Sequence, residues 1–118
     1  MNRDHQSLLD MMQSAEIVLA YMENVSQRDF YSNVNLQDSV IRRLLVIGEA
    51  ANRVSKGTRM ALPSIEWHKI RGNRNRLIHD YDDIDLAIVW KTVQEQMKPL
   101  ISEIKLALPP DDQMSLFD

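Results

Sequence analysis

The sequence predicts an all-α fold: an antiparallel four- to five-helix up-and-down bundle that forms a homodimer. Glycine is scarce, at 3 of 118 residues. The alternating pattern of strands is nearly absent, and apolar residues recur with the 3.6-residue period of helices. A chain of this length buries only about two-thirds of its unfolded surface. We therefore expect one helical domain at residues 1–108, a mobile tail at 109–118, and a second copy that covers leftover apolar surface.

The first half of the chain contains two amphipathic helices. Apolar residues form one continuous stripe over residues 4–25, with Asp4 in the position of an N-cap. The polar stretch at 26–33 is typical of a connection. Asn35 then caps a second helix over 35–55. The other faces of this helix are also rather apolar, which predicts burial on more than one side.

The second half contains the remaining helices. Gly57 has the position of a glycine that terminates the second helix. Ser64 caps a third helical region, in which Gly72 marks a bend. Asp85 caps a final helix over residues 85–108, again with one apolar face. No part of the pattern predicts a sheet.

Composition limits the possible classes of function. The formal net charge is −3, which argues against a general nucleic-acid coat protein but not against a local basic site. The chain contains no cysteine, so disulfides and thiolate catalysis are excluded. Its polar beginning has no secretory signal pattern, and no apolar run approaches the ~20 residues that span a bilayer. We expect a soluble, cytoplasmic protein without membrane contacts.

The functional centre is predicted in the segment R-G-N-R-N-R-L-I-H-D-Y at residues 71–81. Arginine offers a planar fork of donors that fits a phosphate or a phosphorane, and histidine exchanges protons near neutral pH. In this hypothesis His79 deprotonates a ribose 2′-hydroxyl and Arg74 stabilises the charge that develops on phosphorus. The chemistry needs no metal, and it selects RNA because DNA lacks the 2′-hydroxyl.

The spacing of the segment favours a site shared by two chains. At about 100° per residue, Asn75 and His79 are neighbours on one helical face, and Arg74 and Tyr81 share another. Arg74 and His79 lie about 140° apart on an ideal helix. Two copies that meet across a two-fold axis would bring both residues into one cleft.

A second interpretation of the segment is structural. Arginines followed by aspartates often form a solvated surface of ion pairs, here with Arg71 or Arg76 facing Asp80, Asp82 or Asp83. A histidine near the end of a helix is commonly a capping or hydrogen-bonded structural group. Composition does not decide between these interpretations.

The segment and its flanks resemble a known family. The string from Arg74 to Tyr81 is similar to the R-x4-H-x-Y signature of HepT-type toxins in the HEPN superfamily of helical domains, with Asn75 as the polar residue that follows the arginine. The resemblance covers roughly residues 3–108. Three blocks carry it: L-Q-D-S-V-I-R-R-L-L-V-I-G-E-A-A-N-R at 36–53, P-S-I-E-W-H-K-I-R-G-N-R-N-R-L-I-H-D-Y at 63–81 and I-D-L-A-I-V-W at 84–90.

The resemblance implies a ribonuclease toxin that cuts tRNA or mRNA in a cleft between the facing motifs of a homodimer. It also implies a cognate antitoxin, a minimal nucleotidyltransferase of the MntA type, that transfers AMP from ATP to Tyr81. The toxin itself would need no cofactor, and no DNA partner is expected. AMP would add bulk and negative charge beside Arg74 and His79. The alternative for Tyr81 is an unmodified structural aromatic residue.

Other residues are candidates for supporting roles. Glu49 and Asn52 share one helical face and could orient Arg74 or a neighbouring arginine from behind. The alternative is a surface ion pair between Glu49 and Arg53, four residues apart. The remaining candidates for RNA binding belong to the motif itself: Arg71, Asn75 and Arg76.

Neither a metal site nor a purely catalytic role follows from the residues alone. His5 and His68 have no evident partner for a metal site, so none is assigned. A different class of function also stays open, a non-catalytic helical interaction subunit that binds a nucleotidyltransferase or a nucleotide. The acidic net charge and the run D-Y-D-D-I-D favour this alternative, because acidic groups near a cleft oppose RNA.

Overall fold

The computed structural model describes residues 3–79 and 83–109, without the side chains of Ile78 and His79. In this part of the chain every regular element is a helix, so the predicted all-α class is confirmed. The helices are more numerous than predicted because two short ones join the four long ones. The elements are α1 (Arg3–Tyr21), α2 (Gln27–Tyr31), α3 (Val34–Arg53), α4 (Lys56–Ala61), α5 (Trp67–His79) and α6 (Leu86–Ala107).

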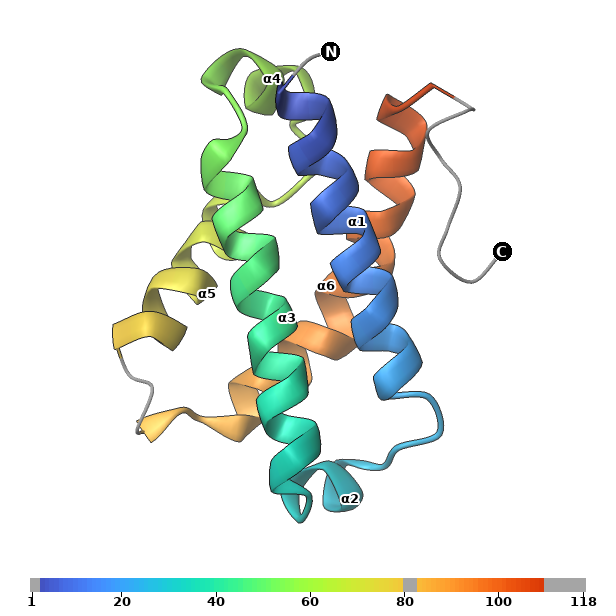
Figure 1. The fold of residues 1–118 in the computed structure, drawn as a ribbon, viewed down its shortest axis with the longest axis vertical. Coiled ribbons are helices and arrows are strands. Elements are labelled where there is room, and N and C mark those ends of the chain that lie inside the picture. The colour runs from blue at the N-terminus through green and yellow to red at the C-terminus, as the bar shows by residue number, and fades with distance from the viewer. Residues whose placement is uncertain (1–2, 80–82, 110–118) are drawn as a thin grey trace.

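The four long helices alternate in direction along the chain, and α3 lies in the middle of the view in Figure 1. Helix α3 packs against α1 and against α5, while α1 also packs against α6. The apolar stripe of α3 faces the core: Val40, Leu44, Ile47 and Ala51 are buried, and Leu36 is partly buried. The core contains these fully or almost fully buried side chains: Met11, Met12, Val18, Phe30, Val40, Ile47, Val54, Val93, Met97 and Ile104.

The predicted connection at 26–33 contains the short helix α2. The hydroxyl of Ser26 caps it by accepting a hydrogen bond from the backbone N–H of Asp29 at 3.0 Å. Phe30 is fully buried and fixes this turn of helix to the core. A helix of 5 residues is too short to give a periodic pattern, so the sequence prediction missed it.

Both predicted ends of the second helix are wrong by a small amount. Asn33, not Asn35, caps α3, because its side chain accepts a hydrogen bond from the N–H of Leu36 at 3.0 Å. At the other end α3 stops at Arg53. Gly57 does not terminate it but lies inside α4.

Asp4 is not an N-cap, because α1 already begins at Arg3. The carboxylate of Asp4 instead accepts hydrogen bonds from the N–H of Ser55 at 2.9 Å, from the Ser55 hydroxyl and from the Thr58 hydroxyl at 2.6 Å. These hydrogen bonds, with the one from the Ser55 hydroxyl strongest, hold the pKa of Asp4 below its usual value. Asp4 thus ties the beginning of α1 to the junction of α3 and α4.

The last two long helices begin differently. Helix α5 begins at Trp67, so the predicted N-cap Ser64 lies outside it. The indole N–H of Trp67 donates to the carbonyl of Leu62 at 3.0 Å, which fixes this beginning. Asp85 caps α6 as predicted, accepting from the N–H of Ala87 at 2.9 Å. None of the helices within residues 3–79 and 83–109 is long and apolar enough to cross a membrane.

Candidate active site

Arg74 lies at a close contact between α5 and α3. Opposite it, α3 carries Gly48. A Cβ atom at this glycine would collide with the Cβ of Arg74 and would lie 2.5 Å from its Cγ and 3.3 Å from its Cα. The two helices can therefore approach this closely only because residue 48 has no side chain. Gly48 was not among the site residues predicted from the sequence, although a glycine inside a helix can indicate a close approach.

The guanidinium group of Arg74 is only partly satisfied. Its Nη1 donates to Oδ1 of Asn75 at 3.2 Å. Its Nε is buried and has no hydrogen-bond partner among the described residues. A buried donor without a partner reduces stability, and more so when the group is charged. Among the described residues, the contacts of Arg74 position its side chain but satisfy only part of its guanidinium group.

His79 is the last residue of α5, four positions after Asn75. Its place in the helix therefore continues the row of Asn75, but its side chain is outside the described residues. Tyr81 also lies outside them, as do Asp80 and Asp82. The approach of Arg74 to His79, within one chain or between two, stays a prediction.

Arg71 is held by α3. Its Nε donates to Oδ1 of Asn52 at 2.8 Å. Asn52 therefore orients an arginine of the motif, whereas Glu49 on the same helix is exposed. The alternative pair between Glu49 and Arg53 is not formed, because Arg53 pairs across to Asp10 of α1 at 3.5 Å.

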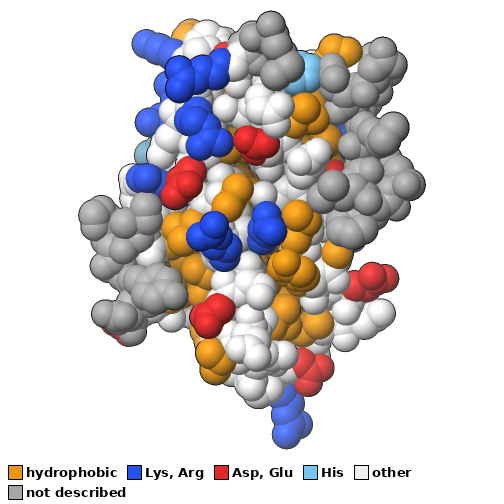
Figure 2. Space-filling view, in the orientation of Figure 1, with side chains coloured by type: hydrophobic (Ala, Val, Ile, Leu, Met, Phe, Trp, Pro, Cys, Tyr) orange, Lys and Arg blue, Asp and Glu red, His pale blue; other side chains and the backbone are white. Residues whose placement is uncertain are grey.

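Arg71 also lines a shallow polar groove between α3 and α5. The groove has a volume of about 470 Å³. In Figure 2 Lys and Arg side chains gather over α4 and the beginning of α5, interrupted by acidic ones. The residues that line the groove are Asn52, His68, Arg71, Gly72 and Asn75.

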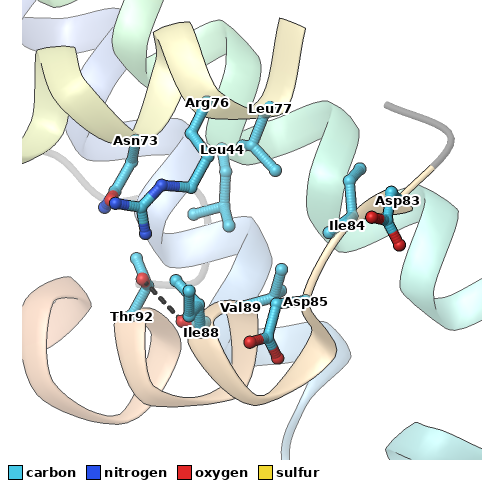
Figure 3. Close-up of a pocket in the computed structure, with 10 residues that line it drawn as sticks. All are labelled: Leu44, Asn73, Arg76, Leu77, Asp83, Ile84, Asp85, Ile88, Val89 and Thr92. Carbon is cyan, nitrogen blue, oxygen red and sulfur yellow. Dashed lines mark hydrogen bonds between the residues drawn. The ribbon is translucent and has the colours of Figure 1, made fainter. Parts of the chain in front are cut away.

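Arg76 lies on another side of α5 and does not join this group. It borders a cavity of about 210 Å³ between α3, α5 and the beginning of α6. In Figure 3 its side chain extends from α5 toward Thr92 and Ile88 of α6. Residues two positions apart on a helix point about 200° apart, so Arg74 and Arg76 could not share one face. We find no geometric basis for placing Arg76 beside Arg74 in one chain.

The described residues test the structural interpretation only for Asp83, because Asp80 and Asp82 lie outside them. Lys69 pairs with Glu66 at 2.7 Å, and the hydrogen bond and charge of Glu66 raise the pKa of Lys69. Within the described ranges no ion pair joins a carboxylate to the three arginines of the motif. In the same ranges no three His, Asp or Glu side chains are grouped so that they could hold a metal ion.

Comparison with known proteins shows the family to which this chain belongs. Residues 11–107 match the family described as "Ribonuclease HepT-like". The match spans most of the chain, and the protein therefore belongs to the HepT-like ribonuclease family. The resemblance predicted from residues 36–53 and 63–81 is confirmed at the level of the family.

Individual relatives carry names of the same kind. "Putative RNase MJ1380" of Methanocaldococcus jannaschii is 32% identical over 99 residues, which cover 84% of this chain and 91% of the relative. "Probable ribonuclease HepT" of Thermococcus cleftensis is 32% identical over 101 residues, 85% of this chain and 92% of the relative. "Putative RNase TTE0752" of Caldanaerobacter subterraneus is 28% identical over 95 residues, 80% of this chain and 85% of the relative. No solved structure gives a significant match.

Proposed function

We propose that this protein is a metal-independent endoribonuclease that acts as the toxin of a toxin–antitoxin pair. The observation that carries the proposal is the position of Arg74 in a chain of the HepT-like ribonuclease family. Gly48 lets the arginine pack at the crossing of two helices, and Nη1 is held toward Asn75. The next position of that row, one turn further along α5, is His79.

In the proposed reaction the 2′-oxygen of a ribose attacks the adjacent phosphorus. His79 accepts the proton of the 2′-hydroxyl, and the bond from phosphorus to the 5′-oxygen breaks. The leaving 5′-oxygen takes up a proton, so the products are a 2′,3′-cyclic phosphate and a 5′-hydroxyl. Arg74 stabilises the negative charge on the phosphorane oxygens. Arg74 is partly exposed, and its Nη2 has no hydrogen-bond partner among the described residues, which leaves this terminal nitrogen for a substrate phosphate.

Tyr81 is the proposed switch. Its phenolic oxygen would bond to the α-phosphorus of ATP and lose its proton, with pyrophosphate as the leaving group. A nucleotidyltransferase antitoxin would catalyse this transfer. The attached AMP would place a negative charge near Arg74 and repel the phosphate of an RNA substrate.

The cleft is proposed to form between two copies of the chain in the cytoplasm. An isologous interface would duplicate Arg74 and His79 and place both sets in one cleft. The substrate would be tRNA or mRNA.

The test is cleavage of total cellular RNA by the purified protein in the presence of EDTA. The wild type should produce fragments that end in a cyclic phosphate. Arg74→Ala and His79→Ala should each be slower by about 10²-fold or more. The matched control is Arg28→Ala, because Arg28 is exposed on α2, at the end of α3 opposite to α4 (Figure 1).

Two outcomes would contradict the proposal. Cleavage that stops on chelation would overturn the metal-independent mechanism. Intact RNA with every variant would favour the non-catalytic interaction subunit. The switch is tested separately by the intact mass after co-expression with the nucleotidyltransferase: whole AMP units should appear on the wild type and be lost in Tyr81→Phe.

A further inference from the structure

One of the residues that line the groove between α3 and α5 is a glycine, Gly72. Gly72 lies in the middle of α5, and a Cβ atom built there would meet no atom within 4 Å. Gly48 is required by a contact inside the chain, but Gly72 is not. Glycine inside a helix lowers stability relative to alanine, so its presence here calls for something outside the described fold. One established use of glycine is the close approach of a ligand to the backbone.

The polar groups around Gly72 offer donors. Oδ1 of Asn52 accepts from Arg71, and Oδ1 of Asn75 accepts from Arg74. Each amide oxygen therefore accepts from an arginine, and the two N–H donors of each amide have no partner among the described residues. Arg71 has further donors at its terminal nitrogens, and these have no partner among the described residues. Among the described residues, none of those that line the groove carries a carboxylate.

This combination of features fits an anion with several acceptor oxygens. A phosphodiester offers such oxygens, and an arginine fork is the protein group best matched to it. The spacing also gives a direction: His68, Gly72 and Asn75 lie at intervals of four and three residues, so they form one row along α5. Four residues further, the same row reaches His79 at the end of the helix.

We propose that the groove of Asn52, His68, Arg71, Gly72 and Asn75 binds an RNA phosphodiester next to the one that is cleaved. Gly72 lets the strand lie against the helix, and Arg71, oriented by Asn52, neutralises its charge. His68 donates a hydrogen bond at the far end of the groove. This inference rests on the proposed ribonuclease function, since it assigns how the same site holds the strand beside the reacting group.

The experiment measures binding without cleavage, using a fluorescein-labelled single-stranded RNA in which every 2′-hydroxyl is methylated. Gly72→Ala should be folded, with an equal or higher melting temperature, and should bind this RNA about tenfold more weakly. The matched control is Gly57→Ala. Gly57 also has no neighbour within 4 Å of a built Cβ, and it lies in α4 outside the groove. It should gain stability and bind as the wild type does.

Arg71 gives a second, independent measurement. Arg71→Gln should lower the slope of log affinity against log salt by about 0.7, the value for one phosphate contact on a single strand. Arg28→Gln removes the same charge outside the groove and should leave the slope unchanged. Inorganic phosphate should compete only weakly with the labelled RNA, because it lacks the neighbouring nucleotides that also contact the protein.

Several results would overturn the inference. Gly72→Ala that binds as tightly as the wild type, or Arg71→Gln with an unchanged slope, would do so. Light scattering measures the assembly state of Gly72→Ala. If weaker RNA binding is accompanied by altered assembly, the groove is a contact between copies of the chain instead. These results are independent of Arg74→Ala and His79→Ala, which report on cleavage. The proposed RNA binding in the groove can therefore be disproved while the ribonuclease activity is confirmed, and the ribonuclease activity can be disproved independently.

Discussion

Gly48 and Arg74 are a pair in which each residue limits what the other can be. A β-carbon at 48 cannot coexist with the present position of the arginine side chain. Arg74 keeps a buried Nε without a described partner, so it gains little from its own hydrogen bonds. Its place in the fold depends on shape, and this dependence can be measured.

Gly48→Ala is expected to damage both stability and cleavage. Alanine improves helix propensity by about 1 kcal/mol, but overpacking against Arg74 should cost about 1–3 kcal/mol. A displacement of Arg74 of about 1 Å can reduce the reaction about 10²-fold. Urea unfolding and RNA cleavage measure the two effects, with Gly57→Ala as the control without a clash. A Gly48→Ala protein as stable and as active as the wild type would refute the close approach.

At the scale of the helices, Asp4 joins α1 to the junction of α3 and α4. Its carboxylate accepts three hydrogen bonds from two residues more than fifty positions away. The folded pKa is lower than the ordinary value of 3.8. The stabilisation is therefore complete above about pH 5, begins to fall near the unfolded pKa and is lost as the pH falls through the lowered folded pKa.

Asp4→Asn should consequently destabilise the protein by about 1–3 kcal/mol at neutral pH. The difference in the free energy of unfolding between Asp4→Asn and the wild type should stay constant down to about pH 5. It should become smaller below pH 4, because only the wild type can lose a charge at this position. Urea unfolding at a series of pH values measures it. Asp38→Asn is the matched control, since Asp38 is exposed on α3. A difference that widens on acidification would contradict the assignment.

The helices also explain how far the sequence could predict the fold. Long amphipathic stretches gave the class, the inward face of α3 and the Asp85 cap, because each depends on nearby residues. Helices α2 and α4 have 5 and 6 residues, fewer than two turns, so no period could reveal them. The role of Asp4 depends on a contact between residues far apart in the chain, which no local pattern contains.

Some residues of the candidate site could be predicted from the sequence, and others could not. The motif identified Arg71 and Arg74, and helical angles alone would have separated Arg76 from them. Gly48 and Gly72 were missed as parts of the site, since the value of an absent side chain appears only when its neighbours are known. The approach of one motif to its copy depends on a second chain.

At the scale of the whole molecule, the shared cleft makes a prediction about mixed dimers. If one site takes Arg74 from one chain and His79 from the other, a dimer of Arg74→Ala with His79→Ala keeps one complete site. The mixed dimer should then show roughly half of wild-type cleavage, because one of its two sites is complete.

The measurement is co-expression of the two variants under different affinity tags, followed by cleavage assays of the mixed dimer. Each variant alone is the control and should be inactive. Mixed dimers that remain inactive would indicate that Arg74 and His79 act within one chain.

The empty space that Gly48 leaves for Arg74 has a genetic consequence. Every missense change in a glycine codon adds at least a β-carbon, so no substitution at this codon is conservative. If the protein arrests growth when its antitoxin is absent, surviving colonies should carry changes at codon 48 as well as at codons 74 and 79. A selection of survivors would thus find this part of the active site without knowledge of its chemistry.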